Sequence, residues 1–99
     1  MVFDVSKVTG IEDYEEKIEE LEDEKTRALY YKDEKVFLVV NKNTIEIRTD
    51  EELKKLLIEK YESVMESRYF GRGGVEIVLA GQLDDEELQD LVRLSYNLS

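Results

Sequence analysis

The sequence predicts an α+β fold, with one antiparallel sheet of four to five strands and three helices packed in two layers. Between residues 28 and 48, three strand-like segments follow one another with two-residue joints, which is typical of antiparallel hairpins. Three further segments repeat apolar residues at helical spacing. The length of 99 residues, without linker or repeat, predicts a single domain over residues 1–99.

The N-terminal part is expected to begin with a short strand or ordered arm over residues 1–7. A first helix is then predicted from Thr9 to about Glu24, because Thr9 and Glu12 fit a capping box. Its apolar residues recur on one helical face, which consists of Ile11, Tyr14, Ile18 and Leu21.

The middle of the chain is predicted to form a meander of strands at 28–32, 35–41 and 44–48, with the second one most buried. The joints are Asp33–Glu34 and Lys42–Asn43.

A second helix is predicted from Thr49 or Asp50 to a point before Tyr69, where glycines follow. A strand is expected at 75–80, paired with residues 68–70 across the glycine turn. A third helix should start near Asp84, with an apolar stripe made of Leu88, Leu91, Val92, Ser95 and Leu98.

Composition narrows the functional classes. There are 25 Asp and Glu against 14 Lys and Arg, a formal charge of −11, and neither Cys nor His. Disulfides, thiolate chemistry and histidine catalysis are therefore excluded, and no carboxylate pair stands out as an acid–base couple, so we expect no enzyme. The start of the chain lacks the basic character of a signal peptide, and the longest apolar run, Val36–Val40, has five residues. We therefore expect a cytoplasmic protein without membrane contact, with a composition that suits an archaeal or thermophilic source.

Acidic residues in two loops suggest a divalent-cation site. In the predicted meander, the joint after the first strand and the end of the third lie at the same end of the sheet. The carboxylates that could meet there and bind Ca²⁺ are Asp33, Glu34, Asp50, Glu51 and Glu52. The alternative is that residues 50–52 only cap a helix and complement its dipole.

Two other surfaces suggest partners. The acidic face of the predicted first helix could bind a basic protein, or it could simply be solvated. The turn Gly71–Gly74, with Arg68 nearby, could cradle phosphate, but a tight hairpin is the favoured explanation. The charge of −11 makes nucleic acid an unlikely partner.

From about Tyr30 onward, the chain resembles the bacterial MmcQ/YjbR-like family. The matching residues are Lys35-Val36-Phe37 and the closing run Leu83-Asp84-Asp85-Glu86-Glu87-Leu88, followed by Leu91-Val92 and Ser95-Tyr96. The resemblance implies a two-layer α+β fold and a protein- or nucleic-acid-interaction module. Where the family usually has a Trp near basic residues, this chain reads Gly73-Gly74-Val75-Glu76, which argues against nucleic acid.

In size, charge and element order the chain is also similar to small acidic proteins of methanogenic archaea, one of which is described as calcium-binding. The first hypothesis is therefore a non-catalytic Ca²⁺-binding protein. The alternative is an interaction module of the MmcQ/YjbR type that uses the sheet edge and the turn carrying Arg68 and Arg72.

Overall fold

The structure is a computed structural model, and it describes residues 3–22 and 25–99. Its centre is a six-stranded sheet in the order β1-β2-β3-β4-β6-β5, with all neighbours antiparallel. The strands are β1 (Glu15–Glu20), β2 (Thr26–Lys32), β3 (Lys35–Val40), β4 (Thr44–Arg48), β5 (Val64–Ser67) and β6 (Gly71–Val78). The helical elements are a 3-10 turn η1 (Val5–Lys7) and the helices α1 (Glu51–Lys60) and α2 (Asp85–Leu98).

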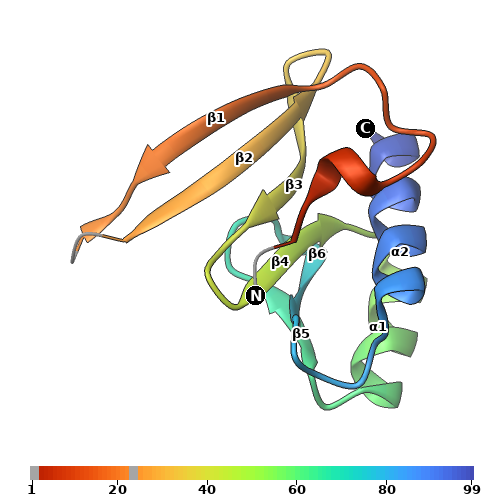
Figure 1. Cartoon of the computed structure of the whole chain (residues 1–99). Coiled ribbons are helices and arrows are strands. Elements are labelled where there is room, and N and C mark those ends of the chain that lie inside the picture. Colours follow the sequence, from red (N-terminus) through yellow and green to blue (C-terminus); the bar gives the residue numbers. More distant parts are fainter. Residues whose placement is uncertain (1–2, 23–24) are drawn as a thin grey trace.

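The helical elements cover one face of the sheet (Figure 1). Helix α2 packs against β3 and β4, and α1 packs against β5 and β6. The core between the layers contains Phe37, Ile47 and Ile77 from the sheet and Val92 from α2, all fully buried. The opposite face of the sheet carries no helix in the described part of the chain, and its centre is covered by the turn between β5 and β6.

The predicted sheet of four to five strands with three helices is wrong, because the first predicted helix is largely strand β1. The four apolar residues that suggested a helix do not share a face. Ile11 is buried in the core and the Tyr14 ring meets the Tyr30 ring edge-on at 5.7 Å, whereas Ile18 is 58% exposed. Cross-strand partners on β2 stabilise the strand instead, so tertiary contacts override the local helical pattern.

The second predicted helix is also too long. Helix α1 ends at Lys60, and Val64 and Met65, placed on its apolar stripe, belong to strand β5. Of the two predicted starts of this helix, Thr49 and Asp50, the cap is Asp50, whose side chain accepts from the N–H of Leu53. The predicted start of the last helix near Asp84 is confirmed, since Asp84 forms a capping box with Glu87.

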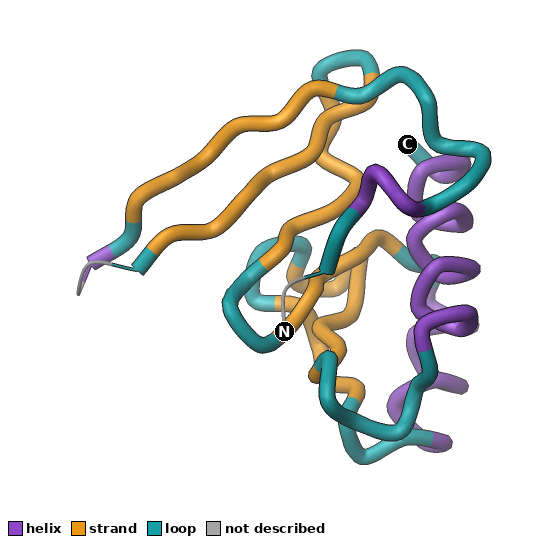
Figure 2. The backbone as a smooth tube through the Cα atoms, in the orientation of Figure 1, coloured by secondary structure: helices purple, strands orange, loops and turns teal. Residues whose placement is uncertain are grey.

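Strands β1 and β2 form a ribbon that projects away from the helices (Figure 2). Every residue of β1 except Glu19 is exposed, and β1 is the edge strand of the sheet. Residues 23–24, where the predicted first helix was expected to end, lie outside the described residues.

Candidate functional site

The five acidic residues predicted to bind Ca²⁺ lie at one end of the sheet. Asp33 and Glu34 form the β2–β3 turn, both with positive φ (50° and 70°), as a tight hairpin turn requires. Asp50 caps α1, with Glu51 and Glu52 in its first turn. The start of β3 lies beside the end of β4, since the Arg48 Nε donates to the carbonyl oxygen of Val36 at 2.6 Å.

These residues do not form a recognisable cation site in the described structure. Across residues 3–22 and 25–99, no three acidic side chains are grouped so that they could hold a metal ion. One oxygen of Asp50 is used by the helix cap, at 2.7 Å from the Leu53 nitrogen. Binding of Ca²⁺ by these loops stays a prediction.

The most unusual polar group of the molecule is a pair of buried glutamates. Glu46 on β4 and Glu76 on β6 are direct cross-strand partners on the helix-free face. They are only 1% and 2% exposed. Carboxyl groups buried side by side away from water need hydrogen-bond partners around them.

Glu46 is held by neutral donors. One oxygen accepts from the Ser67 hydroxyl at 2.8 Å and from the backbone N–H of Tyr69 at 2.9 Å. The other accepts from the Asn41 side-chain amide at 2.9 Å. The bonds from Ser67 and Tyr69 attach the end of β5 and the β5–β6 turn to β4.

Glu76 has a cationic partner. Both of its oxygens accept from the Arg68 guanidinium, at 2.9 and 2.8 Å, and one also accepts from the Thr44 hydroxyl at 2.7 Å. Burial alone would raise the pKa of Glu76, but the hydrogen bonds from Arg68 and Thr44 outweigh it and hold the pKa below its ordinary value. The Arg68 side chain itself is 78% exposed.

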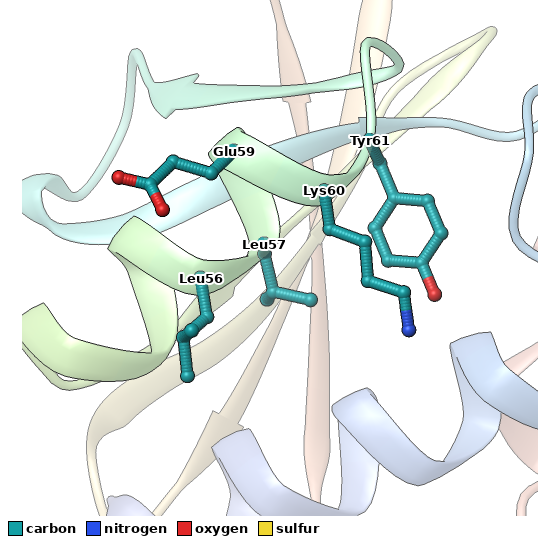
Figure 3. Close-up of a pocket in the computed structure, with 5 residues that line it drawn as sticks. All are labelled: Leu56, Leu57, Glu59, Lys60 and Tyr61. Atoms are coloured by element: carbon teal, nitrogen blue, oxygen red, sulfur yellow. The ribbon is translucent and has the colours of Figure 1, made fainter.

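The glutamate pair has the character of a structural clamp. All four carboxylate oxygens have hydrogen-bond partners, and no described hollow reaches them. An open hollow lies along α1 instead, where Lys60 and Tyr61 project together (Figure 3). The Tyr61 hydroxyl there donates to Glu87 at 3.2 Å. The absence of catalysis stays a prediction.

The glycines after the turn serve strand packing. A Cβ on Gly74 would lie 2.2 Å from the carbonyl oxygen of Ile47 and 2.9 Å from the Phe70 side chain. Only glycine therefore lets β6 approach β4 beneath the Phe70 ring. This requirement accounts for Gly74 without any phosphate, and the guanidinium of Arg68 is already engaged by Glu76.

Arginines and aromatic rings meet beside the clamp. The Arg27 guanidinium lies 5.2 Å from the Tyr69 ring centroid, and that of Arg48 lies 5.0 Å from the Phe70 ring. Arg27 is also paired with Glu19 at 2.6 Å. These cations therefore hold the turn and the ribbon against the sheet.

The acidic edge is the outer side of the projecting ribbon, formed by β1. Its six residues are four glutamates, Lys17 and Ile18. Glu19 pairs with Arg27, and Glu16 accepts a hydrogen bond from the Tyr30 hydroxyl at 2.6 Å. Within the described ranges, Glu15 and Glu20 make no ion pair, and Ile18 stands exposed between glutamates.

Sequence reasoning missed the buried glutamate pair and placed the acidic surface on a helix instead of an edge strand. The segments Ile45-Glu46-Ile47 and Val75-Glu76-Ile77 share an apolar-Glu-apolar pattern, which signals that the two glutamates can align on one face. The pattern does not reveal that a turn covers them. The acidic edge was recognised as a possible surface for a basic partner, but on a helix.

Comparison of the chain with protein-family models, curated proteins and solved structures finds no match. The resemblance to the MmcQ/YjbR-like family therefore stays a prediction. Neither helix of the described chain has the length and apolar character needed to span a bilayer.

Proposed function

We propose that this protein is a non-catalytic interaction module that binds a positively charged segment of another protein through the acidic edge. The observation that carries the proposal is the β1–β2 ribbon, which extends its acidic outer strand away from the two-layer body (Figure 1). A strand of this kind contributes little to the core, because only Glu19 in it is even partly buried.

Charge supports a basic partner. The chain has a formal charge of −11, and the segment from Glu12 to Glu22 contains a single cation, Lys17. Such a surface attracts a basic segment over long distances and repels nucleic acid. The same composition also keeps edge strands from aggregating, which is the competing explanation that a test must exclude.

The test is a titration of the full chain with synthetic pentalysine at low salt, followed by amide NMR. Replacing Glu15 and Glu20 together by Gln should weaken binding about fivefold, since each exposed ion pair contributes a fraction of a kcal/mol. The control replaces Glu59 and Glu62 by Gln, which changes the net charge equally at the α1 end of the molecule. Affinity should then stay nearly unchanged.

Equal losses in the two double variants would reject the proposal, because they would show that pentalysine responds only to net charge. Absence of any saturable binding would reject it as well, and the glutamates would then act as edge protection alone.

A further inference from the structure

The acidic edge offers backbone groups as well as charge. The N–H of Leu21 donates to the carbonyl oxygen of Lys25 at 2.7 Å. The backbone N–H and C=O of Leu21 therefore point toward the β2 side of the ribbon. In an antiparallel ladder the facing groups alternate from one residue to the next. With the register of Glu20 opposite Thr26 and Ile18 opposite Ala28, the N–H and C=O of Glu16, Ile18 and Glu20 therefore point outward.

We propose that the basic segment binds as an added strand along β1, pairing its backbone with the outward groups of Glu16, Ile18 and Glu20. This inference rests on the proposed function and specifies its binding mode. Strand addition to a free sheet edge takes its affinity from main-chain hydrogen bonds and its specificity from alternate side chains.

Side chains on β1 define the partner's pattern. Glu16, Ile18 and Glu20 lie on the same face of the strand, because successive residues alternate between faces. The matching segment therefore carries an aliphatic residue opposite Ile18, with a lysine or arginine two residues away on either side. Ile18 is 58% exposed, so an aliphatic neighbour would remove apolar surface from water.

A second copy of this chain fits the acidic edge poorly. Four of the six residues of β1 are glutamates, so pairing two β1 strands in either direction places glutamates beside glutamates. Like charges directly opposite each other in a sheet are destabilising. Charge complementarity therefore selects a basic partner over self-association.

The experiment uses the full chain and the synthetic peptide acetyl-Lys-Thr-Val-Glu-Lys-Lys-amide, designed to place Val opposite Ile18 in an antiparallel alignment. N-methylation of Val removes the N–H that would donate to the Ile18 carbonyl. N-methylation of Thr, whose N–H would point away from β1, is the matched control. The Val-methylated peptide should bind about tenfold more weakly than the Thr-methylated one.

A protein variant tests the apolar contact separately. Ile18→Thr keeps a β-branched residue in the strand and should weaken peptide binding about threefold. Met65→Thr, at an exposed apolar position on the opposite edge strand, should leave it unchanged. Thermal unfolding of each variant establishes that it is folded. Slowed hydrogen exchange at Ile18 and Glu20 in the complex is also expected.

Two failures are distinguishable. If the two methylated peptides bind with equal affinity and hydrogen exchange of the β1 amides is unchanged, strand addition is overturned. The proposed function still holds in that case if pentalysine binds at the acidic edge. If neither the peptide nor pentalysine binds, both proposals fall.

Discussion

Glu46 and Glu76 are neighbours across the β4–β6 pair, yet only Glu76 is paired with a guanidinium. Glu46 depends on the Ser67 hydroxyl, the Tyr69 N–H and the Asn41 amide. Because the Tyr69 N–H lies in the β5–β6 turn and Ser67 ends β5 just before it, the conformation of this turn depends on the hydrogen bonds to Glu46.

The Arg68–Glu76 pair should contribute measurably to stability. Arg68→Ala leaves a buried carboxylate with one hydroxyl donor and should reduce the free energy of unfolding by about 2 kcal/mol. Arg72→Ala, an exposed arginine in the same segment, should change it by less than about 0.5 kcal/mol. Urea unfolding of both variants provides the comparison, and equal values would show that the bidentate pair adds no stability.

Acid should weaken the clamp through Glu76. Its pKa in the folded protein lies below the ordinary value of 4.5, so the folded state favours the ionised form. The resulting stability is present above the ordinary pKa and is lost as pH falls through the lowered pKa. The difference in unfolding free energy between the wild-type chain and Glu76→Gln should therefore shrink as the pH is lowered below about 4. A difference that stays constant from neutral to strongly acidic pH would contradict this.

Gly74 should not tolerate a side chain. Gly74→Ala places a methyl group against the Ile47 carbonyl and the Phe70 ring, and should cost about 3 kcal/mol or prevent folding. At Gly73 the nearest atom to an added Cβ lies 3.5 Å away, so Gly73→Ala should be nearly neutral. Thermal denaturation monitored by circular dichroism would separate the two, and similar melting temperatures would disprove the close approach of β4 and β6.

Asp50 allows the calcium hypothesis to be tested separately from helix capping. Asp50→Ala should reduce stability by about 1 kcal/mol through loss of the cap, whereas Asp50→Asn keeps a capping side chain. If the loops bind Ca²⁺, Asp50→Asn combined with Glu34→Gln weakens Ca²⁺ binding without unfolding the chain. Calcium titrations observed by amide NMR, with Mg²⁺ as a control, check this. Unchanged Ca²⁺ affinity would exclude these loops.

The central strands could be predicted from sequence because their signals are local. Strands β3 and β4 lie where the apolar run Val36–Val40 and the alternation in Thr44–Arg48 predict them. Helices α1 and α2 begin directly after Asp50 and Asp84. Each of these features depends on a few adjacent residues, so neighbouring sequence suffices to identify it.

The first strand could not be predicted in the same way, because it is specified by residues far along the chain. Glu16 and Glu19 find Tyr30 and Arg27 only after the ribbon has formed, and nothing near Ile18 reveals that pairing. Burial of Glu46 is equally non-local, since it requires residues 67–69 to fold over β4. The local alternation correctly assigned Glu46 to the polar face, but that face is covered at this point.

The glutamates of β1 constrain how this surface can evolve. Substitutions that neutralise Glu15, Glu16 or Glu20 would reduce selectivity for cations and at the same time remove the repulsion between copies. Substitutions that make β1 more apolar would therefore promote aggregation before a new binding specificity could arise. Replacing Ile18 by another aliphatic residue would leave the repulsion between the glutamates of two copies intact. Divergent relatives with the same ribbon should thus vary at position 18 while keeping Glu15, Glu16 and Glu20 acidic.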